Sequence, residues 1–128
     1  MRSAEIQEKI DEYEYWDAWV SRLECRYFAD EIELAHEYDD NDEIVYEFSG
    51  CYKSEFDHVK NYDKLKPVKD MTPPQMPYYL QNVEIGMQVD GDITFYTCKI
   101  NMFPLYLEIW CKDISVTKQN IIKKTIGK

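Results

Sequence analysis

The residues best suited to chemistry in this sequence are carboxylates gathered in one stretch. The segment from Asp30 to Glu47 carries nine acidic side chains and no lysine or arginine. Such a group could bind a hard cation, which takes several oxygen ligands, or attract a positively charged protein. The residues that we predict to bind a partner are eight carboxylates and two tyrosine anchors: Asp30, Glu31, Glu33, Glu37, Tyr38, Asp39, Asp40, Asp42, Glu43 and Tyr46.

A calcium loop is the sharpest alternative use of these carboxylates, and its spacing fails. If Asp39 were position 1 of an EF-hand loop, position 6 would have to be glycine but is Ile44. Position 12 would have to be a bidentate glutamate but is Gly50. The pattern therefore favours a charged hairpin tip over an ion site, and we expect no metal and no cofactor.

The two histidines could ligate zinc or iron together with carboxylates. His36 alternates with Leu34 and Ile32, which predicts a buried, hydrogen-bonded imidazole rather than a ligand. His58 has no second histidine at the spacing of a metal motif. A joint site would require the fold to bring the two rings together.

Nucleophilic catalysis requires a thiol or hydroxyl beside a base that a third group orients. Cys51 could meet His58 and Asp57 if residues 52–58 formed a short helix that folds back. No family signature surrounds this cysteine, so an inert, half-buried thiol is the simpler interpretation and we expect no enzyme. The other cysteines, Cys25, Cys98 and Cys111, lie in apolar or alternating segments, which predicts reduced thiols packed in the core.

Charge and composition exclude further classes of function. The 128 residues carry a formal net charge of −10, and hydrophobic residues make up 45% of them, enough for one domain with its own core. Residues 1–59 hold 18 acidic and five basic side chains, whereas residues 60–128 hold seven and ten. Binding to nucleic acid would need clustered lysine and arginine, and the four glycines form no phosphate-binding motif. A charged partner should therefore be basic.

The first half of the chain reads as a helix followed by an acidic antiparallel meander. Ile6, Ile10 and Tyr13 recur at helical spacing, which predicts an amphipathic helix over residues 3–15. Over residues 18–49 the hydrophobic period changes to two, which predicts three strands separated by turns at 29–31 and 39–42.

The second half predicts another meander. Residues 50–77 contain four prolines and read as a connecting segment. Strands follow over residues 78–112, with Asp90 and Gly91 giving the strongest hairpin signal. The basic tail, residues 113–128, could add a strand or a short helix, and we favour the helix. The fold class is thus mainly β in a single domain, either as one sheet or as a sandwich.

The pattern of apolar residues bears on the location that we expect for the protein. The first residues lack the apolar segment of a signal peptide, and no apolar run is long enough to cross a membrane. We expect a cytoplasmic protein with no membrane partner.

Two tracts carry a family resemblance. The segment Tyr15 to Cys25, and then Val45 to Tyr52 after the acidic meander, resemble small bacterial immunity-type proteins over residues 15–59. These are the families that accompany polymorphic toxins and contact-dependent inhibition; Trp16 stands where many members carry histidine. The resemblance implies antiparallel strands, no enzymatic activity, and binding to a cognate toxin, frequently a nuclease. It assigns no individual site residue.

The leading hypothesis is therefore an immunity protein that neutralises a basic toxin through an acidic, aromatic surface. The alternative is a small accessory or regulatory protein whose acidic face serves only solvation. A third possibility is a hydrolase that uses Cys51 and His58.

Overall fold

The computed structural model describes residues 2–60 and 66–121, except for the side chain of Pro73, and confirms a mainly β protein. One α-helix precedes six strands, and two short 3-10 helices lie in the connection between the third and fourth strands. The elements are α1 (Arg2–Glu12), β1 (Val20–Arg26), β2 (Glu31–Glu37), β3 (Asp42–His58), η1 (Val68–Asp70), η2 (Pro73–Gln75), β4 (Asn82–Asp90), β5 (Ile93–Met102) and β6 (Leu105–Asn120).

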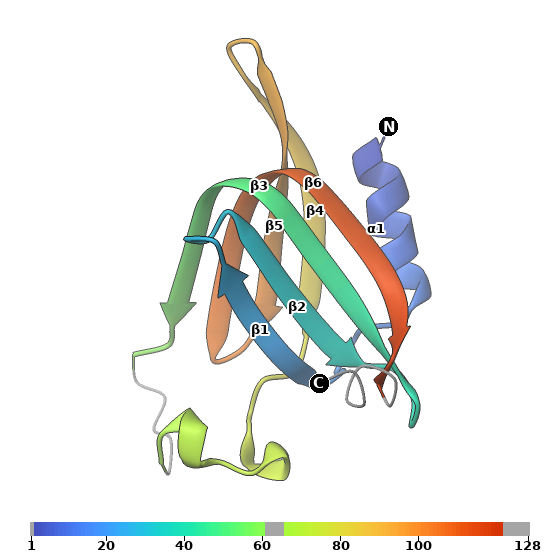
Figure 1. Ribbon diagram of the computed structural model, residues 1–128, viewed down its shortest axis with the longest axis vertical. Helices are drawn as coiled ribbons and strands as arrows, with labels where there is room; N and C mark the ends of the chain where they lie inside the picture. Colours follow the sequence, from blue (N-terminus) through green and yellow to red (C-terminus); the bar gives the residue numbers. More distant parts are fainter. Residues whose placement is uncertain (1, 61–65, 122–128) are drawn as a thin grey trace.

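The six strands form one antiparallel sheet in the order β1-β2-β3-β6-β5-β4. The two meanders are the two halves of this sheet, and the long strands β3 and β6 join them by pairing along almost their whole length (Figure 1). Of the two arrangements left open by the sequence, the single sheet is the one observed.

The sheet bends sharply across the middle of β3 and β6 (Figure 1). A bulge lies between Cys51 and Lys53, and Gly50 beside it has a φ of +64°. A Cβ atom at Gly50 would lie only 3.1 Å from the Cβ of Lys112 on β6. Glycine at this position therefore permits both the left-handed backbone and the close approach of the two strands.

The two edges of the bent sheet are tied together at one end. Trp19, just before β1, forms a bridge with Tyr79, just before β4. The Val20 N–H donates to the carbonyl of Tyr78 at 2.9 Å, and the Leu80 N–H donates to the carbonyl of Ala18 at 2.9 Å. This closure encloses the concave face of the sheet.

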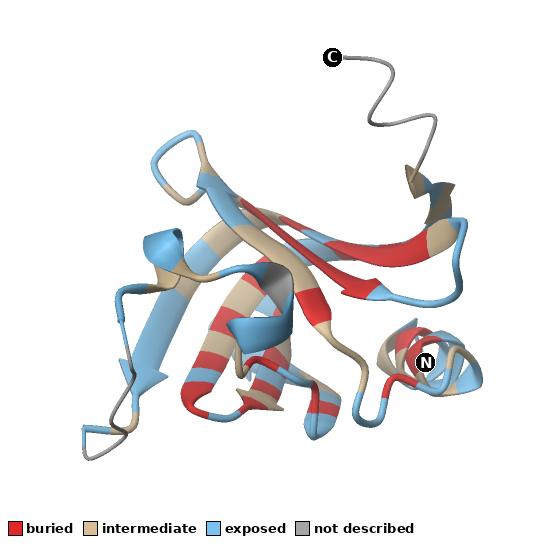
Figure 2. Cartoon of the chain, turned by 90° about the horizontal axis from the view of Figure 1, so that it is seen from below, coloured by how far each residue is buried: buried red, intermediate tan, exposed pale blue. Residues whose placement is uncertain are grey.

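The core fills this concave side, with α1 lying against β4 and β6 (Figure 1). Ile6 and Ile10 of the helix are buried, as their helical spacing predicts. Buried and exposed residues alternate along much of the strands (Figure 2). The largest fully buried side chains include Tyr15 and Phe48, which explains how so aromatic a chain places part of its rings.

Several predicted boundaries were wrong. The helix ends at Glu12 instead of residue 15, and the first strand ends at Arg26, so that its turn covers residues 27–30. Residues 50–58 belong to β3 and not to a connecting segment. The tail continues as β6 up to Asn120 and is not helical there; residues 122–128 lie outside the described part of the chain. No described helix is long and apolar enough to cross a membrane.

The four cysteines are free thiols. Cys98 and Cys111 are buried, as predicted, but Cys25, near the end of β1, is exposed. The core prediction was therefore wrong for Cys25.

Candidate functional site

The turn between β2 and β3 presents most of the predicted acidic residues that remain exposed. Glu37, Tyr38, Asp39 and Asp40 are exposed and Asp42 is half-buried. The Oδ1 atom of Asp39 accepts hydrogen bonds from the N–H groups of Asn41 at 2.9 Å and Asp42 at 2.7 Å. Aspartate is favoured at the start of a turn because its side chain can accept hydrogen bonds from the backbone N–H groups that follow. The carboxylate of Asp39 therefore stabilises the turn in which it lies.

The aromatic ring of this turn is held in place by neighbouring elements. Tyr38 is 44% exposed, and its ring lies edge-on to Tyr13, just after α1, with 5.7 Å between the centroids. The Nζ atom of Lys118 on β6 lies 5.4 Å from the centre of the Tyr38 ring. The Ile121 N–H donates to the carbonyl of Asn41 at 2.8 Å. Tyr38 is thus half exposed and half packed, as an interface anchor should be.

Tyr13 was not among the predicted binding residues, because its helical spacing indicated a position facing the core. Its contact with Tyr38 brings the end of α1 to the turn, and Glu12 and Glu14, which flank Tyr13 in the chain, are both exposed. Only the fold could reveal this, because α1 and the turn are distant in sequence. We define the acidic turn surface as Tyr13, Glu37, Tyr38, Asp39, Asp40 and Asp42.

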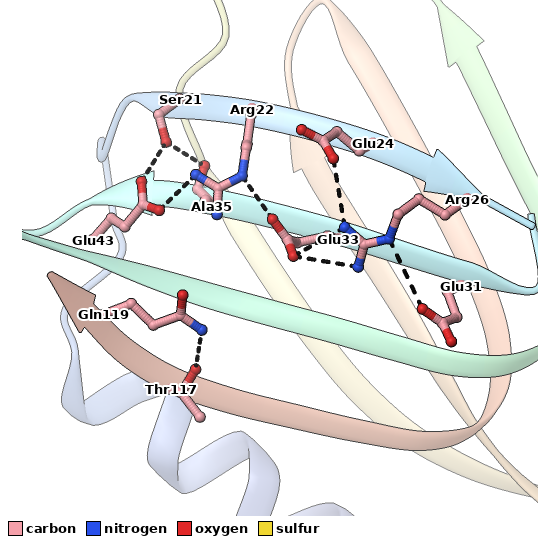
Figure 3. Close-up of polar contacts among 10 residues, drawn as sticks. All are labelled: Ser21, Arg22, Glu24, Arg26, Glu31, Glu33, Ala35, Glu43, Thr117 and Gln119. Atoms are coloured by element: carbon pink, nitrogen blue, oxygen red, sulfur yellow. Dashed lines mark hydrogen bonds and ion pairs between the residues drawn. The ribbon is translucent and has the colours of Figure 1, made fainter. Parts of the chain in front are cut away.

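Glu33 and Glu43 are not part of that exposed surface. Glu33 is 5% exposed and Glu43 is 4% exposed, and both form ion pairs with Arg22 of β1 (Figure 3). The Arg22 Nε lies 2.7 Å from Glu33, and its Nη1 lies 2.5 Å from Glu43. The two glutamates therefore link three strands of the sheet instead of facing solvent, which corrects their expected placement.

The charges of this cluster stabilise one another. Burial by itself lowers the pKa of Arg22, but the hydrogen bonds and negative charges of Glu43 and Glu33 outweigh burial and raise it overall. Ser21 adds a hydrogen bond to Glu43 at 3.4 Å. A buried charge is tolerated when it is paired and hydrogen-bonded in this way.

Tyr46 is also buried, at 0% exposure, and cannot act as a surface anchor in this structure. Its hydroxyl lies 3.2 Å from the Nε2 atom of His36, within hydrogen-bond distance, while Nδ1–H of His36 donates to the carbonyl of Glu37 at 2.8 Å. Because a carbonyl can only accept, Nδ1 of His36 carries a proton, and the Tyr46 hydroxyl can donate to Nε2 of a neutral ring. Burial lowers the pKa of His36, with the smaller opposing effect of Glu37. The prediction of a buried, hydrogen-bonded histidine is confirmed.

Asp30 and Glu31 lie at the opposite end of β2 from the acidic turn surface. β2 has seven residues, so that roughly 20 Å separates its two ends. Asp30 is exposed in the β1–β2 turn, and Glu31 is half-buried, 3.9 Å from Arg26. The ten predicted residues are therefore divided among an exposed turn, a buried layer and a second turn. Their role in binding stays a prediction.

The structure separates Cys51 from His58. Both lie on β3, seven positions apart, so that roughly 20 Å of extended chain lies between them. Burial, together with the nearby charge of Asp30, raises the pKa of the Cys51 thiol to about 11. The pairing considered for a hydrolase is therefore not formed. His36 and His58 are not joined either: within residues 2–60 and 66–121, no three metal-ligating side chains gather.

An apolar groove of about 560 Å³ runs beside β1, lined mainly by Leu23, Val68, Met76, Tyr78 and Met102. A polar depression of about 300 Å³ spans β3, β6, β5 and β4 and includes Glu55, Glu108, Lys99 and Glu84. Ser21 and His58 also line the apolar groove, but the Ser21 hydroxyl donates to the carbonyl of Ala35 at 3.3 Å. The Nε2 atom of His58 lies 3.4 Å from the hydroxyl of Tyr78, so no described hydrogen bond pairs the Ser21 hydroxyl with this imidazole.

Comparison with known proteins gives one family. The model of the family described as Immunity protein PIM7 matches residues 2–118. None of the curated proteins compared with the chain matches it. The family match extends the resemblance seen over residues 15–59 to nearly the whole described chain.

Proposed function

The chain belongs to the Immunity protein PIM7 family, and we propose that it neutralises a basic cognate toxin by binding it through the acidic turn surface, without catalysis. The family supports an immunity function and a toxin as partner. The mechanism, the charge of that toxin and its nature as a nuclease belong to the proposal.

The observation that carries the proposal is the exposure of carboxylates around a half-packed tyrosine. Asp39 and Asp40 are exposed beside Tyr38, and the chain has no lysine or arginine between Asp30 and Glu47. Exposed charges attract an opposite surface over about one Debye length, roughly 8 Å at physiological salt. They raise the rate of association and fix the orientation of the partner, whereas desolvated aromatic rings contribute most of the affinity.

A nuclease is the toxin class that this charge pattern fits best. An enzyme that binds a phosphate backbone carries clustered lysine and arginine. Carboxylates docked on such a cleft would take the places of the phosphates and exclude the nucleic acid. The PIM7 chain would then inhibit by occupying the substrate site.

The test is a matched pair of charge reversals, measured against the purified toxin encoded beside the gene for this chain. Asp40→Lys/Asp42→Lys changes the acidic turn surface but leaves the Oδ1 bonds of Asp39 in place, because the Asn41 and Asp42 donors are backbone groups. Asp90→Lys/Asp92→Lys makes the same change of net charge at the exposed tip of the β4–β5 hairpin.

We expect the Asp40/Asp42 variant to associate about tenfold more slowly, with a weaker dependence on salt, and the control to change by less than about twofold. Stopped-flow or biosensor kinetics over a series of salt concentrations measures the association rate and its salt dependence for both variants. Equal association rates for the two variants would overturn the steering role of the acidic turn surface. Failure of the toxin to bind the natural chain would favour the alternative, an accessory protein whose acidic face serves only solvation.

A further inference from the structure

The β1–β2 turn, residues 27–30, exposes two aromatic side chains that the fold does not use. Tyr27 is 71% exposed and Phe28 is fully exposed, at 107%. Neither ring belongs to the core, and neither stacks on another described ring. Exposed apolar residues are common singly, but two adjacent rings at the tip of a turn are a large apolar surface to leave in water.

The backbone of this turn is unfavourable for the residues that it holds. Tyr27, Phe28 and Ala29 have φ angles of 54°, 58° and 67°. The Asp30 N–H donates to the carbonyl of Tyr27 at 3.1 Å, so Phe28 and Ala29 occupy the two central positions of a tight turn. Those positions favour Asn and Gly, because a Cβ atom is strained at positive φ. The sequence keeps a bulky ring where a small residue would fold more easily.

The surrounding structure holds the turn in this conformation. The carbonyl of Asp30 accepts a hydrogen bond from the N–H of Cys51 on β3 at 3.0 Å. Arg26, the last residue of β1, lies 3.5 Å from Glu24 and 3.4 Å from Glu33 (Figure 3). The turn is therefore fixed by groups on both sides, and its rings are presented on a firm base. Backbone strain maintained in this way is typical of functional sites.

We propose that Tyr27 and Phe28 form an anchor that inserts into an apolar pocket on the surface of the cognate toxin. The inference rests on the proposed function, since it places a second contact on the same partner. Exposed aromatic residues with few rotamers lose little entropy on binding, and they dominate interface affinity when a pocket desolvates them. The pocket would be apolar, with a polar rim that meets the Tyr27 hydroxyl.

Charge and distance agree with a single basic partner. Glu24 and Asp30 beside the anchor are exposed, and Arg26 is matched by three glutamates, so the surroundings of the rings are acidic. The anchor lies roughly 20 Å from the acidic turn surface along β2. An interface of ordinary size buries on the order of 800 Å² on each partner, which is wide enough to cover both turns.

The test separates the rings from the backbone strain. Phe28→Asn/Ala29→Gly installs the residues that the turn prefers and removes one ring. Ala29→Gly alone relieves part of the strain and keeps both rings. Val89→Asn is the control for loss of an exposed apolar side chain, because Val89 is 71% exposed and lies on β4, next to the β4–β5 hairpin turn.

We expect Phe28→Asn/Ala29→Gly to bind the purified toxin about 30-fold more weakly, mainly through faster dissociation, the size of effect that defines an interface hot spot. Its melting temperature should nevertheless rise, which excludes misfolding as the cause. Ala29→Gly and Val89→Asn should bind like the natural chain.

Unchanged dissociation of the toxin from Phe28→Asn/Ala29→Gly would overturn the anchor. If that variant binds normally while Asp40→Lys/Asp42→Lys associates slowly, only the anchor fails and the proposed function stands. If the toxin does not bind the natural chain, both fail together.

Discussion

The two turns at the ends of β2 solve the same geometric problem in opposite ways. In the β2–β3 turn, Asp39 caps the backbone with its own carboxylate, and none of residues 38–41 has a positive φ. In the β1–β2 turn, three successive residues that are not glycine adopt positive φ. Each such residue costs about 1–2 kcal/mol relative to its preferred conformation.

The difference indicates what each turn is selected for. The residue types of the β2–β3 turn agree with its backbone, so its charges cost little stability. The residue types of the β1–β2 turn conflict with its backbone. Such local conflicts are expected where function requires a residue that folding does not favour. Three predictions test this comparison and the strand that connects the two turns.

The largest effect is expected from Arg22→Ala, which should lower the free energy of unfolding by about 3 kcal/mol. Arg22 pairs with Glu33 and Glu43, and without it two nearly buried carboxylates lose their countercharge. The ion pairs among Arg22, Glu33 and Glu43, which connect β1, β2 and β3 between the two turns, would then be lost. Urea unfolding followed by fluorescence measures the change.

Arg26→Ala is the matched control, because it removes the same side chain from the same strand. The Arg26 side chain is 37% exposed and its ion pairs are 3.4–3.9 Å long, so a loss below about 1 kcal/mol is expected. If Arg22→Ala and Arg26→Ala lowered the free energy of unfolding equally, the burial of the Arg22 ion pairs would have no special role.

The second prediction concerns pH at the acidic end of β2. The folded chain holds His36 neutral with a lowered pKa, whereas the unfolded chain protonates this histidine near pH 6.5. The unfolded state therefore takes up a proton first, and the stability that depends on neutral His36 is lost as the pH falls from about 6.5 toward the folded pKa. The slope is at most about 1.4 kcal/mol per pH unit.

Unfolding in urea between neutral and mildly acidic pH measures this slope. His36→Gln should flatten it over that window, although the variant is less stable throughout. The comparison variant His58→Gln removes the other histidine, from an exposed position at the end of β3, and controls for the loss of an imidazole. A pH profile unaltered by His36→Gln would contradict the assignment.

The smallest effect compares the two turns directly. Ala29→Gly should raise the free energy of unfolding by about 1 kcal/mol, because glycine accepts the φ of 67° without strain. Asn41→Gly, in the acidic turn, should give no gain, since φ is not positive there. Thermal melts of the two variants suffice, and an equal response would mean that the turns do not differ in strain.

Part of the fold was predictable because its signals are local. The alternation of residues along β2, and the Asp90 and Gly91 hairpin signal between β4 and β5, specify those elements without reference to the rest of the chain. The second half of β3 was missed because it pairs only with β6 and is largely exposed. A strand with few buried positions shows no hydrophobic period. The end of β6 was misjudged as helical, because its pairing with β3 is the factor that decides it.

The sequence by itself determined the segregation of charge and the family resemblance, because composition and short motifs do not depend on how distant segments meet. Only the tertiary structure decided which carboxylates face solvent. Glu33 and Asp39 belong to the same acidic stretch, yet Glu33 is buried against Arg22 while Asp39 is exposed. The physical reason is strand pairing, since β1 places a cation beside one carboxylate and leaves the other at the end of the sheet.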